Sequence, residues 1–167
     1  MPTFDVPAAG PVDFPGGTGG YWQFDLPMRG SEVPVDVNVD GDAFTKPMLE
    51  EIKVFIADAA RFDEISREAL EREHNEKPEG TVATYLSHHA EELSEKELAK
   101  IFGVDDPDDL TIDHLVDALQ LKRIGLYPGS DDLTAVFDYT IDEEATDYIL
   151  AVEFDRDGEV IGISMDS

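Results

Sequence analysis

The adjacent residues His88 and His89 come closest to a metal-binding pattern in this chain. His88 and Glu92 are four residues apart, so on a helix their side chains share one side, where imidazole and carboxylate can bind the same zinc ion. A zinc site needs three or four ligands, and the remaining histidines, His74 and His114, are distant in the sequence. His89 falls on the apolar stripe of its segment, where a hydrogen-bonded core histidine is the commoner case. We therefore expect no dedicated metal site and no cofactor.

Two aspartate-rich stretches contain oxygen ligands of the kind that calcium prefers. An EF-hand loop has glycine at position six and glutamate at position twelve, but counted from Asp155 the glycine is fourth and the twelfth residue is Asp166. A two-residue hairpin turn at Asp157-Gly158 explains this stretch. The second stretch, 105–109, has four carboxylates just before Thr111, a pattern typical of a helix N-terminus. We expect a dedicated calcium site at neither stretch.

The familiar catalytic signatures are missing from the sequence. The chain has no cysteine, which removes thiolate nucleophiles, disulfides and cysteine-ligated clusters. No serine lies in a nucleophile elbow, and the glycine run 16–20 has neither a lysine nor a preceding strand, so it is not a phosphate loop. Pairs of carboxylates carry almost no information among 39 acidic residues. We expect no catalytic residue, and an enzyme whose carboxylate or metal site has no motif is kept as an alternative.

The net charge is the strongest compositional feature. The chain has 39 Asp and Glu against 12 Lys and Arg, a formal net charge of −27 over 167 residues, and the excess runs along its whole length. This excess argues against binding to nucleic-acid phosphates and to anionic lipid. It favours either a basic partner reached by electrostatic steering or a surface adapted to a salt-rich interior.

The polar candidates must be positioned by elements that the hydrophobic pattern predicts. Residues 1–20 form an N-terminal arm rich in proline and glycine, with no signal-peptide pattern, in which apolar residues could form a short edge strand. A single domain is expected over 21–167. Strands are predicted at Tyr21–Met28 and at Val33–Val39, where valine alternates with polar residues. Pro34 cannot donate a ladder hydrogen bond, so this strand, or that end of it, should lie at an edge.

Four helices follow in the predicted order. The first runs from about residue 47 to 74 after the N-cap Thr45, and the second carries the apolar stripe of 82–93. The third begins at a capping box, Ser94 to Glu97, and ends at Gly103; the fourth begins at Thr111.

The last third of the chain predicts an antiparallel meander. Residues 121–127 are strand-like, period-2 patterns cover 135–141, 148–154 and 161–165, and short turns separate these segments. The predicted fold class is therefore α+β: an antiparallel sheet of two N-terminal strands and a four-strand meander, covered on one face by about four helices. Lys122 and Arg123 should point to opposite faces of their strand, and we expect Arg123 to pair with Asp138 or Asp147.

Some of these segments also resemble a known family. The motifs are the runs 122–128, 135–140 and 146–150, and Phe154-Asp155 with Gly158. Over 33–167, and most clearly in the last third, they resemble the bacterial family catalogued as domain of unknown function 2004. The resemblance implies the α+β fold and a bacterial type of cytoplasmic setting, and it brings no catalytic residue to this chain.

The function that these observations favour is binding without catalysis. The expected protein is an acidic inhibitor or immunity-type protein of the cytoplasm, which neutralises a basic partner such as a nuclease toxin, with carboxylates in place of phosphates. A soluble domain with a salt-adapted surface is the alternative, beside the enzyme mentioned above. The expected partner-binding residues are Asp105, Asp106, Asp108, Asp109, Asp142, Glu143, Glu144 and Tyr127.

Overall fold

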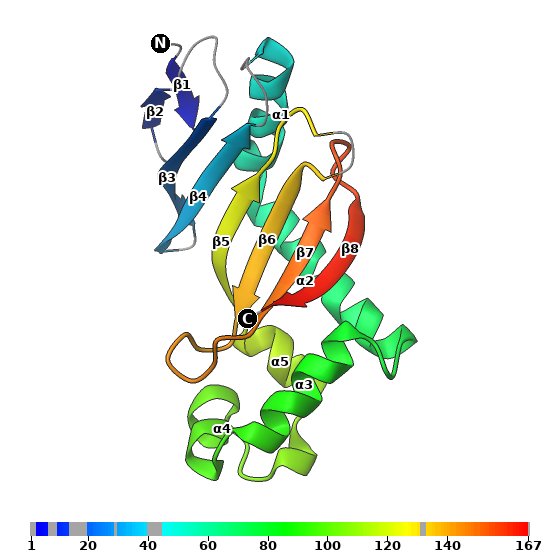
Figure 1. Ribbon diagram of the computed structural model, residues 1–167. Coiled ribbons are helices and arrows are strands. Elements are labelled where there is room, and N and C mark those ends of the chain that lie inside the picture. The colour runs from blue at the N-terminus through cyan, green and yellow to red at the C-terminus, as the bar shows by residue number, and fades with distance from the viewer. Residues whose placement is uncertain are drawn as a thin grey trace.

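The chain folds as an α+β protein whose main element is a six-stranded, mostly antiparallel open sheet with helices packed against it (Figure 1). The computed structural model describes residues 3–6, 10–13, 20–28, 30–39, 45–130 and 133–166. In strand order the sheet contains β3 (Gly20–Met28), β4 (Ser31–Val39), β5 (Gln120–Leu126), β6 (Ala135–Thr140), β7 (Ile149–Phe154) and β8 (Val160–Asp166). The predicted fold class is confirmed.

Two features of the sheet go beyond the predicted pattern. The meander β5–β8 is antiparallel as expected, but β4 pairs with β5 in parallel, over only three residues of each strand. A parallel neighbour is possible because a long helical segment returns the chain from the end of β4 to the start of β5. In the N-terminal arm, β1 (Thr3–Val6) and β2 (Gly10–Asp13) pair with each other as a separate two-stranded sheet, so neither is an edge strand of the large sheet.

The helices of the described chain lie between β4 and β5 in the sequence. They are α1 (Lys46–Ala57), α2 (Ala59–Glu76), α3 (Thr81–Glu92), α4 (Glu95–Phe102), the 3-10 turn η1 (Pro107–Asp109) and α5 (Ile112–Ala118). Helices α1 and α2 run along one face of the sheet, and α3, α4 and α5 gather at the end where β5 begins (Figure 1). Among the elements that the structure describes, no helix covers the opposite face of the sheet.

The predicted first helix is two helices. Asp58, with φ −117° and ψ 31°, leaves the helical region and separates α1 from α2, so the prediction of one helix over residues 47–74 is wrong. The apolar stripe continues across the break because Phe55 and Phe62 pack together, with ring centroids 4.7 Å apart. Both rings also contact Phe154 of β7, and this aromatic cluster joins the two helices to the sheet.

The predicted helix starts are confirmed in detail. The Oγ of Ser94 accepts a hydrogen bond from the Glu97 amide at 3.2 Å, and Glu97 Oε1 accepts one from the Ser94 amide at 3.1 Å. Thr45 and Thr111 cap α1 and α5, and Gly103 ends α4 in the left-handed conformation, with φ 73°. These local signals fix the helix ends, and hence where each connection begins.

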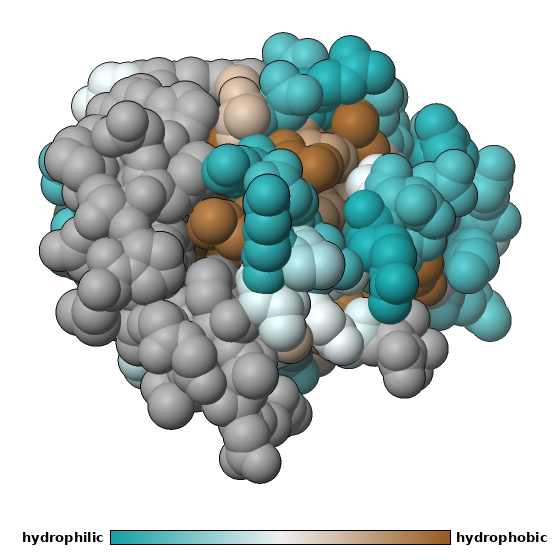
Figure 2. Space-filling view, turned by 90° about the horizontal axis from the view of Figure 1, so that it is seen from above, coloured by the Kyte–Doolittle hydropathy of each residue, from teal (hydrophilic) through white to brown (hydrophobic). Residues whose placement is uncertain are grey.

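The alternation of side chains gives the sheet two different faces. On β4, Val33, Val35, Val37 and Val39 are buried on the helix-covered side and belong to the hydrophobic core. The residues between them point to the open face. Seen from above, the described surface is largely hydrophilic, with hydrophobic residues visible between the polar ones (Figure 2).

Candidate functional site

A cleft opens where β4 and β5 separate. The parallel ladder joins Val35–Val37 to Ile124–Leu126 and includes no residue before Val35. Pro34 has no amide proton to donate, so the ladder starts just after it. The ladder to β3 does include Pro34, opposite Asp25, so this end of β4 has a paired strand on one side only. The strand β4 as a whole lies inside the sheet, and β3 is the edge strand.

A bulge in β5 shapes the other side of the cleft. Leu121 pairs with Tyr139 and Arg123 pairs with Asp138, which leaves Lys122 as the extra residue. The bulge lets Leu121 stay on the core side of β5 while Arg123 points to the open face. Without it, these two side chains would lie on the same face.

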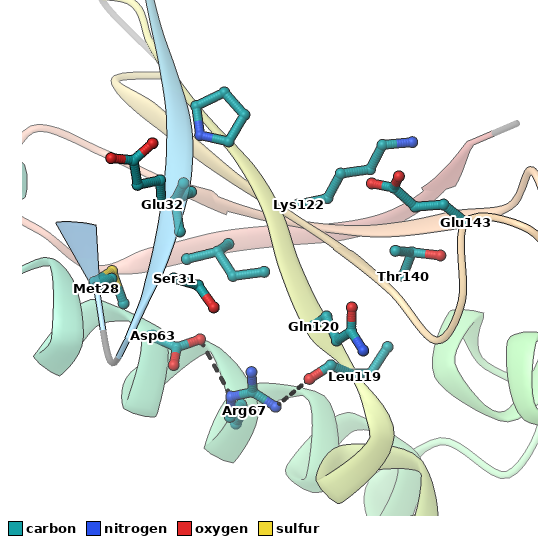
Figure 3. Close-up of a pocket in the computed structure, with 13 residues that line it drawn as sticks. Met28, Ser31, Glu32, Asp63, Arg67, Leu119, Gln120, Lys122, Thr140 and Glu143 are labelled. Carbon is teal, nitrogen blue, oxygen red and sulfur yellow. Dashed lines mark hydrogen bonds and ion pairs between the residues drawn. The ribbon is translucent and has the colours of Figure 1, made fainter. Parts of the chain in front are cut away.

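The cleft has a volume of about 460 Å³, within the range of small-molecule sites (Figure 3). Its floor is formed by Asp63 and Arg67 of α2. Its walls are partly apolar, and its outer part carries charged and polar groups. The wall residues are Met28, Val33, Pro34, Leu119 and Leu121, with the buried Thr140, and the outer residues are Ser31, Glu32, Gln120, Lys122 and Glu143.

Three contacts hold Arg67 at the floor of the cleft. Its Nε donates to Asp63 Oδ1 at 3.2 Å, and its Nη1 donates to the carbonyl oxygens of Val116 and Leu119 at 2.7 and 2.9 Å, at the C-terminal end of α5. The guanidinium carbon lies 5.2 Å from the ring centroid of Tyr139, a cation–π distance. The orientation of this side chain is therefore fixed by an acid, a helix end and an aromatic ring.

The acid beneath Arg67 is itself anchored. The hydroxyl of Tyr139 donates to Asp63 Oδ1 at 2.6 Å, and both residues are buried. Burial, with the negative charge of Asp63 next to it, holds the pKa of Tyr139 well above its usual value. Tyr139 therefore keeps its proton and remains the donor in this pair.

The remaining guanidinium nitrogen of Arg67 points into the cleft. Nη2 donates to no residue in the part of the chain that the structure describes. Figure 3 shows it directed away from Asp63 and Leu119, toward the space below Ser31 and Gln120. The Arg67 side chain is 22% exposed, and the residue lines the cleft.

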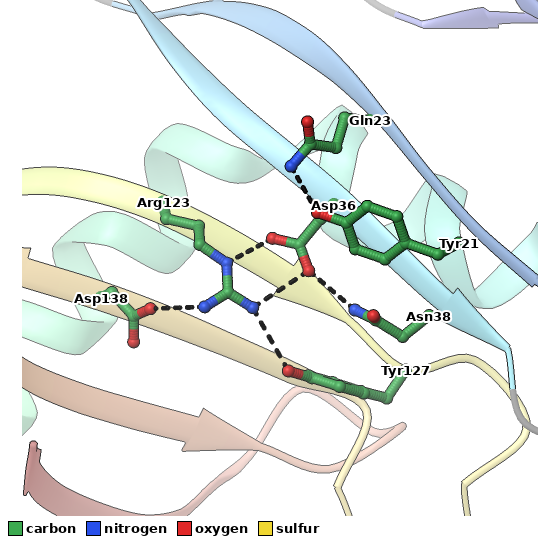
Figure 4. Close-up of polar contacts among 7 residues, drawn as sticks. All are labelled: Tyr21, Gln23, Asp36, Asn38, Arg123, Tyr127 and Asp138. Carbon is green, nitrogen blue, oxygen red and sulfur yellow. Dashed lines mark hydrogen bonds and ion pairs between the residues drawn. The ribbon is translucent and has the colours of Figure 1, made fainter.

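A second arginine cluster lies on the open face of the sheet (Figure 4). Arg123 donates from Nε and Nη2 to the two carboxylate oxygens of Asp36, from Nη1 to Asp138 Oδ2 at 3.1 Å and from Nη2 to the Tyr127 hydroxyl at 3.3 Å. The predicted pairing of Arg123 with Asp138 is confirmed, and Asp147 is not its partner. Arg123 thus makes two hydrogen bonds to one aspartate and a third to a second aspartate. We call Arg123 with Asp36, Asp138 and Tyr127 the arginine clasp.

The neighbours of Arg123 leave it no free nitrogen. A Cβ built on Gly125 would approach Arg123 Nη2 to 2.8 Å, so glycine here leaves the space that the guanidinium occupies. The hydrogen bonds to Asp36 raise the pKa of Arg123. Burial raises the pKa of Asp138, and Arg123 partly opposes this effect. All three guanidinium nitrogens of Arg123 are therefore hydrogen-bonded within the protein, and none remains for a ligand.

The acidic residues expected to bind a partner lie in connections at one end of the molecule. The α4–α5 connection carries Asp105, Asp106, Asp108 and Asp109, all exposed, and the β6–β7 connection carries Asp142, Glu143 and Glu144 (Figure 1). Asp106 and Asp142 each accept a backbone hydrogen bond from the residue two positions later, so these two carboxylates shape their own turns.

The structure brings one of these acids into a hollow with three others. Glu144 and Asp147 of the β6–β7 connection line a hollow of about 330 Å³ with Glu92 of α3 and Glu97 of α4. The aromatic ring of Tyr148 lines the same hollow. We call this group of four carboxylates the acidic hollow. Glu143 instead borders the cleft between β4 and β5.

Tyr127 does not lie with these acids. It follows β5, whereas the β6–β7 connection follows β6, and antiparallel strands end at opposite ends of the sheet. Its hydroxyl contacts Arg123 on the open face. Tyr127 therefore lies on a different part of the molecule from the acidic connections.

His89 has the core role that the sequence favoured. It is 1% exposed, and its Nδ1 lies 2.7 Å from the carbonyl oxygen of Tyr85, which can only accept. Nδ1 therefore carries the proton, and Nε2 accepts from the Thr146 hydroxyl at 2.8 Å. Burial lowers the pKa of His89. The neutral imidazole thus attaches the β6–β7 connection to α3.

The carboxylate of Asp155, one of the residues considered as a calcium ligand, accepts hydrogen bonds within its own turn. No group of three or more metal-type ligands close enough to hold an ion occurs within the described ranges. Asp155 Oδ1 accepts from the amides of Asp157 and Glu159 at 2.9 and 3.0 Å, and Gly158 has φ 80°, as a hairpin turn requires. A hairpin turn lies at the predicted place, but it has three residues, 156–158, between Asp155 and Glu159 rather than the two that the sequence predicted.

Sequence reasoning missed the residues that organise the cleft and the clasp. Asp63 and Arg67 are four residues apart on a helix, the spacing of an ion pair, but such pairs are usually solvent-exposed and carry no functional signal. Asp36 lies on the polar side of a correctly predicted strand, but its pairing with Arg123 depends on the parallel ladder. Long-range strand order was the missing information.

Comparison with protein-family models, curated proteins and solved structures gives no match to this chain. The resemblance to domain of unknown function 2004 therefore stays a prediction from the motifs. Within the described ranges, no helix is both long enough and apolar enough to cross a membrane.

Proposed function

We propose that this chain is a non-catalytic binding protein of the cytoplasm that captures a basic protein, as an inhibitor or immunity-type protein does. The observation that carries the proposal is the acidic hollow, where Glu92, Glu97, Glu144 and Asp147 surround one cavity beside the ring of Tyr148. A lysine or arginine side chain of a partner would find carboxylates and an aromatic surface together there.

The charge of the whole chain supports the same proposal. A net charge of −27 accelerates the encounter with a cationic protein, and the exposed acids of the α4–α5 connection extend the negative surface at the same end. Asp105, Asp108 and Asp109 form no ion pair with any residue that the structure describes. Their charges are available to a partner, in particular to a nuclease whose substrate cleft is basic.

The test is affinity capture from a lysate of the source organism with three versions of the tagged protein. The first is wild type. The second is the triple variant Glu92→Gln, Glu144→Gln, Asp147→Asn, which leaves Glu97 intact because it completes the α4 capping box. The third is the matched control Glu68→Gln, Glu71→Gln, Glu76→Gln, which removes three exposed charges from α2.

The proposal expects one stoichiometric basic protein with wild type and with the control, and its loss with the hollow variant. With the purified partner, the association rate should fall as salt rises. A partner that is retained equally by both triple variants would contradict the role of the acidic hollow. Recovery of background proteins alone, with unfolding stability that increases with salt, would favour the salt-adapted surface instead.

A further inference from the structure

The cleft between β4 and β5 has the features of a ligand site, and these are independent of the acidic hollow. Its volume of about 460 Å³ suits a small molecule. Two of the 12 basic residues of this strongly acidic chain, Arg67 and Lys122, line it. A cation at the floor of a partly apolar cleft is an unusual arrangement on a surface dominated by carboxylates.

The guanidinium of Arg67 is oriented before any ligand arrives. Asp63, the end of α5 and the ring of Tyr139 use Nε, Nη1 and one face of the group, while Nη2 points into the cleft (Figure 3). Because its other contacts are already made, Arg67 loses little conformational freedom when Nη2 binds an acceptor. An anionic acceptor gains most, since a charge-assisted hydrogen bond is stronger than a neutral one.

The walls determine what the rest of the ligand must be. Val33 and Leu119 are almost fully buried and contribute apolar surface above the floor, with Met28 and Leu121 beside them. A compact apolar body of several carbons suits these walls. A highly charged anion does not, because Glu32 and Glu143 stand at the outer part of the cleft and would repel it.

We propose that this cleft binds a small organic monocarboxylate, with its carboxylate on Arg67 Nη2 and its apolar chain against the walls between β4 and β5. Lys122, the bulged residue of β5, lies at the outer part of the cleft and offsets the repulsion from Glu143. The cleft shares no lining residue with the acidic hollow, so either proposal can fail while the other holds.

The test is calorimetric titration of the full chain with hexanoate and with hexanamide, which has the same body without the charge. About 0.5 M KCl shortens the distance over which the net charge of the protein repels an anion to a few ångströms, so that the measured affinity reflects contacts within the cleft. The proposal expects saturable one-site binding of hexanoate, about tenfold tighter than that of hexanamide. Amide NMR shifts should centre on Ser31, Arg67 and Gln120.

Three variants locate the binding. Arg67→Gln should weaken hexanoate binding by about tenfold or more, and Arg61→Gln, the same charge change at an exposed position of α2, should leave it within about twofold. Gln120→Trp keeps Arg67 and fills the cleft from an exposed position, so it should abolish binding even if Arg67→Gln fails to fold. Absence of saturable binding up to about 50 mM, or equal binding by Gln120→Trp, would overturn the proposal.

Discussion

The two arginine clusters lie on opposite sides of the same strand. Asp138 and Tyr139 are neighbours in β6 and point to opposite faces; Asp138 binds Arg123 on the open face, and Tyr139 binds Asp63, the partner of Arg67, on the covered face. On the open face every guanidinium nitrogen donates to a residue of the sheet. On the covered face one nitrogen remains for the cleft. On the open face the arginine is thus fully hydrogen-bonded within the sheet, whereas on the covered face the arginine keeps one nitrogen directed into the cleft.

The difference follows from what surrounds each guanidinium. Arg123 lies on β5, which is paired with β4 on one side and with β6 on the other, so Asp36, Asp138 and Tyr127 all reach its guanidinium. Arg67 comes from a helix below a place where the strands separate, so no strand side chain covers its outer nitrogen. An interruption in the sheet, rather than a special sequence motif, creates the candidate ligand site.

The largest expected effect is the loss of Asp63. Asp63→Ala removes the carboxylate that accepts from both Arg67 and the Tyr139 hydroxyl. Arg67 then keeps only the carbonyl oxygens of Val116 and Leu119 as acceptors, and the buried hydroxyl loses this acceptor. We expect the free energy of unfolding to fall by about 3–5 kcal/mol in urea denaturation. Asp63→Asn, which keeps an oxygen for Tyr139, should lose less. A loss below about 1 kcal/mol for Asp63→Ala would show that the covered cluster is not a structural anchor.

A smaller effect is expected on the open face. Arg123→Ala leaves Asp36 and Asp138 together without a cation, but the Arg123 side chain is 39% exposed, so water screens part of this repulsion. We expect a loss of about 1–2 kcal/mol in unfolding free energy, with Arg123→Lys between this variant and wild type. Unchanged stability of Arg123→Ala would mean that the clasp contributes nothing.

The loss caused by Arg123→Ala should depend on pH. Burial already raises the pKa of Asp138, and removing Arg123 raises it further. A carboxyl with a raised pKa in the folded state destabilises the fold as pH rises through that pKa, because the unfolded chain ionises more easily. The difference between variant and wild type should therefore be larger at pH 7 than near pH 4, a result that urea denaturation at both pH values can check.

The smallest expected effect comes from His89, which serves as a reference because no arginine touches it. Its pKa is lowered from 6.5 by burial, so the unfolded chain binds the proton first as pH falls. Unfolding free energy should decrease below about pH 6.5, and this decrease should be smaller in His89→Gln. Thr146→Val, which keeps the imidazole, should retain it. Identical pH profiles of His89→Gln and wild type would contradict this role.

Most of the fold was predictable because local rules determine it. Alternating residues predicted the strands, and Thr45, the box from Ser94 to Glu97 and Thr111 predicted the helix starts. The break at Asp58 was not predictable from the stripe, because Phe55 and Phe62 keep the apolar period across it.

The candidate site was predictable only in part. The acidic connections stand out in the sequence, and the structure adds Glu92, Glu97 and Asp147 to Glu144. The cleft was hidden, because it depends on where the ladder between β4 and β5 stops and on the bulge at Lys122. Both are relations between distant segments, which a local pattern does not contain.

The short parallel ladder also has a consequence for how the chain folds. The hairpin β3–β4 and the meander β5–β8 each join strands that are close in the sequence, whereas Asp36 and Arg123 are 87 residues apart. Closing so long a loop costs more chain entropy than forming a hairpin, and the backbone ladder that it makes has only three residue pairs. The seam between β4 and β5 should therefore close last during folding and open first in local unfolding, which makes it the natural hinge of the molecule.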